Sequence, residues 1–233
     1  MSACGKYRRN SHRDQCIHMA KEVFVKSYYT ILKPISTEIF EKRSRFIANI
    51  FPVESELEAK EILESVREKY SDANHNCFAY VIRHERGTTE GFSDDGEPSG
   101  TAGKPILSVI NGSKLKNVII IVTRYFGGTL LGTGGLVRAY HSSAKSAINE
   151  SQIIKRIYGY KMKIQISYND LKKVEYTFTQ KQIKVLNTNY TDVVDVYVGI
   201  PNDQEDMLVN MINEITNGKC TITNEGEYWL VEM

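Results

Sequence analysis

Apolar and polar residues alternate along the first folded part of the chain, which is the pattern of half-buried β-strands. The alternation covers residues 28–32 and 46–50, and Pro52 ends the second stretch. A further strand is expected at residues 77–83, and a hairpin-like connection through Gly87 should follow it.

One stretch shows no alternation. Residues 118–122 read Val-Ile-Ile-Ile-Val, and such a β-branched apolar run is typical of a strand covered on both faces. We expect this buried strand to continue to Tyr125 and to lead into a glycine-rich loop.

Three segments favour helices in the same half of the chain. Ser55 and Glu58 form a capping box that predicts a helix ending near Tyr70. The expected apolar stripe of that helix consists of Leu57, Ile62, Leu63 and Val66. A short helix is expected from Ala102 to Ile110, and a longer, alanine-rich helix from about Leu136 to Glu150.

After Ser151 the composition shifts towards Lys, Tyr, Ile and Asn, and glycine becomes rare. The predicted order is strand 158–167, helix 170–181, strands 183–187 and 192–200, helix 203–217 and strand 219–232. This βαββαβ order predicts a ferredoxin-like domain. The chain is therefore expected to be an α+β protein with two domains, residues 19–150 and 158–233, joined near 151–157.

Residues 1–18 are polar, basic and without periodicity, and we predict a disordered leader. An addition upstream of the native start, with Met19 as the first residue, is an alternative origin for this leader. The leader contains four residues of the types that bind zinc, namely Cys4, His12, Cys16 and His18. Their spacing matches no finger or ribbon, so we predict no metal site.

Composition and charge narrow the class of protein. Hydrophobic residues make up 41% and charged residues 25%, which is ordinary for a globular protein. No apolar run approaches the roughly 18 residues of a membrane span, and the N-terminus lacks the apolar core of a secretory signal. The four cysteines are widely separated, which suits free thiols in a reducing compartment. A cytoplasmic location is therefore expected.

The net charge of +2 is concentrated at the N-terminus. Residues 1–18 hold four Lys and Arg residues against one Asp, so they carry +3 and leave −1 for the rest. Bulk electrostatics therefore does not indicate a nucleic-acid-binding protein, and any such site must be a local patch.

Glycine is concentrated in two segments on either side of the buried strand: the first glycine segment (residues 91–105) and the second glycine segment (residues 124–140). Such clusters indicate unusual backbone angles, or backbone pressed against another group. The second glycine segment lacks the spacing of a dinucleotide fingerprint, and no Gly-Lys-Ser/Thr follows it. We therefore predict no nucleotide cofactor, and no other cofactor is indicated.

The second glycine segment could nevertheless bind an anion such as phosphate or sulfate. Backbone N–H groups at a helix N-terminus attract anions, and Arg124 and Arg138 flank this turn. The glycines of the expected site are Gly127, Gly128, Gly132, Gly134 and Gly135. In the alternative, the glycines form a tight turn and the arginines pair with acids of the first glycine segment, namely Asp94, Asp95 or Glu97. The sequence leaves both open.

Three residues are candidates for catalysis, namely His75, Asp94 and Asp95. The carboxylates could act as general acid or base or hold a divalent cation. Yet Asp-Asp-Gly-Glu-Pro also forms a good turn in which the carboxylates accept hydrogen bonds from nearby N–H groups. Cys77 follows His75 by two residues, but no third partner supports a nucleophile.

The two glycine segments resemble the hallmark blocks of the IMPACT/YigZ family. The blocks are residues 94–103 and 124–140, and two earlier stretches, 42–48 and 72–80, are similar to further blocks in the family's order. The resemblance covers about residues 25–150 and points to the bacterial two-domain type.

The resemblance implies an N-terminal domain like domain 2 of ribosomal protein S5, and a ferredoxin-like C-terminal domain like the last domain of elongation factor G. It also links eukaryotic members to the regulation of a kinase that senses amino-acid starvation, through binding of that kinase's activator.

Three functions compete at this point. The leading hypothesis is a translation-associated regulator that binds RNA or a ribosome-linked partner in a glycine-lined basic cleft, with Arg43, Arg45, Arg124 and Arg138 as the cations. The second is a hydrolase acting on a phosphoester or peptide in the same cleft. The third is a protein-interaction module in a stress-response kinase pathway.

Overall fold

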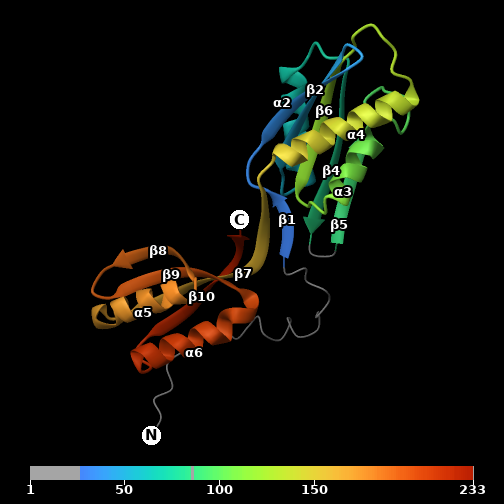
Figure 1. Cartoon of the computed structure of the whole chain (residues 1–233). Coiled ribbons are helices and arrows are strands. Elements are labelled where there is room, and N and C mark those ends of the chain that lie inside the picture. Colours follow the sequence, from blue (N-terminus) through green and yellow to red (C-terminus); the bar gives the residue numbers. More distant parts are fainter. Residues whose placement is uncertain (1–26, 85–86, 233) are drawn as a thin grey trace. The chain divides into compact units, whose positions relative to one another are not determined.

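The computed structural model describes residues 27–84 and 87–232, which form two compact units, Tyr28–Lys155 and Arg156–Glu232 (Figure 1). The predictions for residues 1–18, including the leader, and for Met19 as a start lie outside the described residues. Each unit has its own hydrophobic core and combines helices with a sheet. The predicted two-domain α+β class is therefore confirmed.

The N-terminal unit is built on an antiparallel five-stranded sheet in the order β2-β3-β6-β4-β5. Its strands are β2 (Ile35–Glu41), β3 (Ser44–Pro52), β4 (His75–His84), β5 (Gly87–Ser93) and β6 (Val118–Tyr125). Its helices are α2 (Glu56–Lys69), α3 (Gly103–Gly112) and α4 (Thr133–Glu150). A short strand, β1 (Ser27–Ile31), precedes them.

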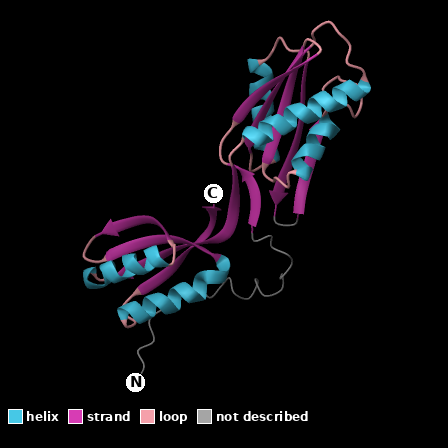
Figure 2. Ribbon diagram, viewed as in Figure 1, coloured by secondary structure: helices cyan, strands magenta, loops and turns pink. Residues whose placement is uncertain are grey.

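Helices cover both faces of this sheet (Figure 2). The central strand β6 directs Ile120 and Val122 into the core under α3 and α4, and Ile119 and Ile121 into the core under α2. Side chains alternate between the faces of a strand, so a strand covered on both sides must be apolar throughout. This explains the uninterrupted run at 118–122 and confirms its predicted burial.

The structure also corrects several details. Strand β2 was not predicted, because its Ser, Thr and Glu residues leave its edge half polar and exposed. Leu57 was wrongly placed in the apolar stripe of α2. It is 68% exposed, and Ala59 lies in the core instead. Helix α4 begins at Thr133, three residues earlier than expected.

The C-terminal unit has the predicted βαββαβ order. Its elements are β7 (Ile153–Ile166), α5 (Tyr168–Gln180), β8 (Lys184–Tyr190), β9 (Val194–Pro201), the 3-10 turn η1 (Asn202–Gln204), α6 (Glu205–Thr216) and β10 (Thr221–Glu232). Strand β7 pairs with β9 and with β10, and β8 pairs with β9. The resulting order β10-β7-β9-β8 is the split βαβ arrangement expected for a ferredoxin-like domain.

Candidate functional site

Asp94 organises the first glycine segment from within. Its Oδ1 accepts hydrogen bonds from the N–H groups of Ala102 (3.0 Å) and Gly103 (2.8 Å), and its Oδ2 accepts one from Gly100 (2.8 Å). Helix α3 has no cap from its own N-cap side chain, so Asp94 satisfies its first N–H groups. Burial alone would raise the pKa of Asp94, but these three N–H donors lower it below its ordinary value.

The carboxylate and the backbone carbonyl of Asp95 also have partners within the fold. Its carboxylate pairs with Arg67 at 2.8 Å and accepts the N–H of Asn76 at 2.7 Å. Its backbone carbonyl lies 2.8 Å from Nδ1 of His75. Because a carbonyl only accepts, Nδ1 is the donor in this contact.

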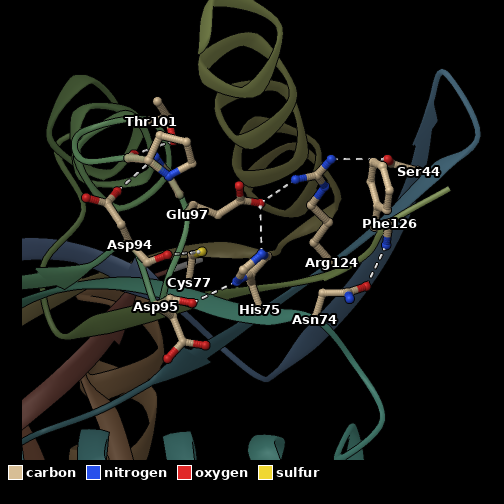
Figure 3. A network of polar contacts seen from close by, with 12 residues as sticks. Ser44, Asn74, His75, Cys77, Asp94, Asp95, Glu97, Thr101, Arg124 and Phe126 are labelled. Atoms are coloured by element: carbon tan, nitrogen blue, oxygen red, sulfur yellow. Dashed lines mark hydrogen bonds and ion pairs between the residues drawn. The ribbon is translucent and has the colours of Figure 1, made fainter. Parts of the chain in front are cut away.

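A buried ion pair joins the two glycine segments (Figure 3). Glu97 Oε1 lies 2.6 Å from Nη1 of Arg124, and the two side chains are 3% and 6% exposed. The same oxygen accepts a hydrogen bond from Tyr140 on α4 (2.8 Å) and lies 3.9 Å from Nε2 of His75. Glu97 therefore connects β4, β6 and α4 at one point.

Cys77 and Tyr140 extend this network into the core. The Cys77 thiol lies 2.9 Å from the backbone carbonyl of Asp94 and 3.3 Å from the Tyr140 hydroxyl. Burial raises the pKa of Cys77 to about 12, and burial together with Cys77 and Glu97 raises the pKa of Tyr140. A thiol of such high pKa is a poor nucleophile.

Arg124 is also stacked between two aromatic rings. Its guanidinium lies 5.4 Å from the ring centre of Phe46 and 5.5 Å from that of Phe126, which is within cation–π range. Its Nη2 donates to Ser44 Oγ at 3.3 Å. Its buried Nε has no hydrogen-bond partner among the residues that the structure describes.

The β2–β3 hairpin packs its tip against the second glycine segment. Lys42 and Arg43 both have positive φ (43° and 70°) and form a two-residue turn between the paired residues Glu41 and Ser44. A Cβ on Gly127 would lie 2.0 Å from the carbonyl oxygen of Arg43, so only glycine fits there. The Gly127 N–H donates to Ser44 Oγ at 3.3 Å.

The cations expected at the site lie in different environments. Arg43 and Arg138 are exposed, and no ion pair links either one to another described residue. Arg45 points to the opposite face of the sheet from its neighbour Phe46, pairs with Glu38 at 2.7 Å and lies over the ring of Tyr125.

The glycines of the second glycine segment fall into two groups. Gly128 and Gly132 have positive φ (79° and 71°), which glycine adopts without strain, and they shape the loop before α4. Gly134 and Gly135 lie in the first turn of α4. The Arg138 guanidinium lies beside Gly134, with Nη1 3.6 Å from the position of a Cβ there. Anion binding by these glycines stays a prediction.

Three residues of this network were missed from the sequence. Tyr140 had a signal, because it follows Leu136 by four residues and precedes Ala144 by four on the buried face of α4. Ser44 and Asn74 had none, since their partners come from distant segments. The Asn74 side chain accepts the N–H of Phe126 at 2.7 Å.

The described part of the chain holds no group of three His, Cys, Asp or Glu side chains that could bind a metal ion. Among the same residues, no helix has the length and apolar character required to cross a bilayer.

Comparisons with known proteins identify the family. The model of the Impact N-terminal domain matches residues 42–148, and that of a domain of unknown function, DUF1949, matches residues 164–219. The IMPACT family member YvyE of Bacillus subtilis is 36% identical over 206 residues, which cover 88% of this chain and 94% of that protein. This chain belongs to the IMPACT family. The predicted family membership is thus confirmed.

One further relative and one solved structure are also similar to this IMPACT-family chain. The IMPACT family member YigZ of Escherichia coli is 38% identical over 161 residues, covering 69% of this chain and 79% of that protein. The crystal structure of a hypothetical protein superposes with a TM-score of 0.58 at 32% identity. It covers 84% of this chain and 96% of that one.

Glu97→Gln should destabilise the protein by about 3 to 5 kcal/mol, because it leaves the buried Arg124 charge without its partner. Urea unfolding of the purified protein measures this. Glu38→Gln is the matched control, since Glu38 pairs with Arg45 at a similar distance but on the surface, and it should change stability little. Equal effects of the two substitutions would contradict the structural role of the buried pair.

The lowered pKa of Asp94 gives a pH-dependent contribution to stability. The contribution should be present above the ordinary value of 3.8 and be lost as the pH falls through the lower folded-state value. The difference in unfolding free energy between wild type and Asp94→Asn should therefore be largest near neutral pH and shrink in acid. Urea midpoints measured across this range test it, and parallel curves for the two proteins would refute it.

Proposed function

We propose that this protein is a translation-associated regulator that acts by binding, with RNA or a ribosome-associated protein as its partner. Membership of the IMPACT family supports the link to translation, because the resemblance connects eukaryotic members with a starvation-sensing kinase. A cytoplasmic location is part of the proposal.

The binding role is supported by a difference between the acids and the cations near the two glycine segments. The acids have partners within the fold, whereas several cations are exposed and without an ion-pair partner among the described residues. Asp94, Asp95 and Glu97 each have partners within the fold. Lys42, Arg43 and Arg138 are exposed, and no ion pair among the described residues involves them. The acids of the first glycine segment are thus occupied within the fold, whereas these three cations are free to contact an anionic partner.

Exposed apolar side chains accompany these cations. Phe126 is 44% and Leu130 83% exposed, both in the second glycine segment. We call these five residues the loop surface: Lys42, Arg43, Phe126, Leu130 and Arg138. Exposed aromatic and aliphatic groups beside cations are typical of a recognition surface.

The hydrolase alternative has less support. A general base needs a carboxylate or imidazole free to take a proton, whereas both candidate carboxylates are occupied by hydrogen bonds or an ion pair. The imidazole of His75 is engaged as well, because Nδ1 contacts the carbonyl of Asp95 and Nε2 lies 3.9 Å from Oε1 of Glu97.

The test is cosedimentation with purified ribosomes at low and moderate salt. Arg43→Gln combined with Arg138→Gln should weaken binding by roughly tenfold and reduce its salt dependence. Lys60→Gln combined with Lys172→Gln removes the same charge from exposed positions on α2 and α5, and it should leave binding unchanged. Failure of the wild-type protein to sediment with ribosomes, or equal losses in both double variants, would reject the proposal.

A further inference from the structure

We propose that the loop surface binds single-stranded RNA, with one base stacked on the ring of Phe126. The inference rests on the proposed function and names the partner of that same surface. It starts from a stack of side chains that runs from the core to solvent.

The stack has three layers. Phe46 is fully buried and packs edge-on against Tyr140, with ring centres 5.2 Å apart. The guanidinium of Arg124, which is 5% exposed, lies 5.4 Å from the ring centre of Phe46. It also lies 5.5 Å from the ring centre of Phe126, which is 44% exposed (Figure 3). A ring that carries a guanidinium on one side and is open to solvent has a face left for another planar group.

Hydrogen bonds hold the backbone that carries the exposed ring of Phe126. The Phe126 N–H donates to Asn74 Oδ1 at 2.7 Å, and the Asn74 N–H donates to the carbonyl of Arg124 at 3.0 Å. On the other side, the N–H of Gly127 donates to Ser44, which also holds the Arg124 guanidinium. These bonds fix the backbone on both sides of Phe126, so little backbone entropy is lost when a ligand stacks on its ring.

Cations for a phosphate backbone lie beside this ring. Gly127 touches the carbonyl of Arg43, so the hairpin tip with Lys42 and Arg43 adjoins the residue that follows Phe126. A Cβ at Gly128 would meet no atom within 4 Å, so the loop here opens to solvent. An aromatic ring next to unpaired cations is the combination that binds single strands: the ring stacks a base and the cations contact phosphates.

These features favour single-stranded RNA over the other partners. A duplex keeps its bases stacked inside and offers none to the Phe126 ring. A protein partner would pack apolar side chains against Leu130. The positive charge of Arg124 on one face of the Phe126 ring instead favours a flat, electron-rich group on the other face. The preference for RNA over DNA comes from the proposed link to translation.

The experiment uses Phe126→Trp in the full chain, with an RNA of about ten nucleotides of mixed sequence as the probe. The protein has a single tryptophan, Trp229, so the added indole emission reports on position 126. Stacking of a base should quench that added emission at the RNA concentration that raises the anisotropy of labelled RNA. Binding without quenching would overturn the stacking assignment.

A matched pair of substitutions tests whether the ring of Phe126 stacks a base. Phe126→Leu keeps an apolar side chain but removes the ring, and it should weaken RNA binding by roughly tenfold because the base loses its stacking partner. Tyr176→Leu removes an exposed ring on α5, outside the loop surface, and should change affinity less than twofold. Equal losses in both variants, after unfolding midpoints show both to be folded, would overturn the proposal.

The RNA-binding and ribosome-binding measurements together distinguish failure of this inference from failure of the proposed function. Ribosome binding by a wild-type protein that does not bind the single-stranded RNA would overturn the inference while the proposed function stands, with a protein partner. Loss of both would reject both. Tighter binding to DNA of the same sequence, or to duplex RNA, would overturn the choice of single-stranded RNA.

Discussion

The buried ion pair between Glu97 and Arg124 is the interaction on which the rest of the site depends. At 2.6 Å, with both side chains almost inaccessible, it joins the first glycine segment to the central strand β6. Tyr140 on α4 donates a hydrogen bond to the same carboxylate oxygen of Glu97, and His75 on β4 faces that oxygen. A charged pair is costly to bury unless its hydrogen-bonding groups are satisfied, so the surrounding donors and rings support it.

The pair divides the site into an inner and an outer part. Inside, Asp94 and Asp95 accept hydrogen bonds from backbone N–H groups, and Asp95 also pairs with Arg67. Outside, Phe126 lies on the Arg124 guanidinium, and the hairpin tip packs on Gly127. The charge that a binding surface needs is therefore supplied by residues that the internal network does not use.

The sequence predicted what depends on local pattern. The strand at 118–125 was evident because burial on both faces requires an unbroken apolar run, and the βαββαβ order followed from its periodicities. Strand β2 was missed because half of its residues are polar. For Arg124, the sequence left ion pairing and anion binding open, and its partner Glu97 lies 27 residues away. No local pattern specifies such a contact, since strand register and loop path determine it. The exposure of Phe126 was hidden for the same reason.

The most direct test of this account is to map chemical-shift changes of backbone amides as a single-stranded RNA of about ten nucleotides is added. The changes should be concentrated at Arg43, Phe126, Gly127 and Gly128, and none should occur along α2. Changes confined to α2 or to the C-terminal unit would contradict the assignment of the binding surface to the loops around the buried ion pair.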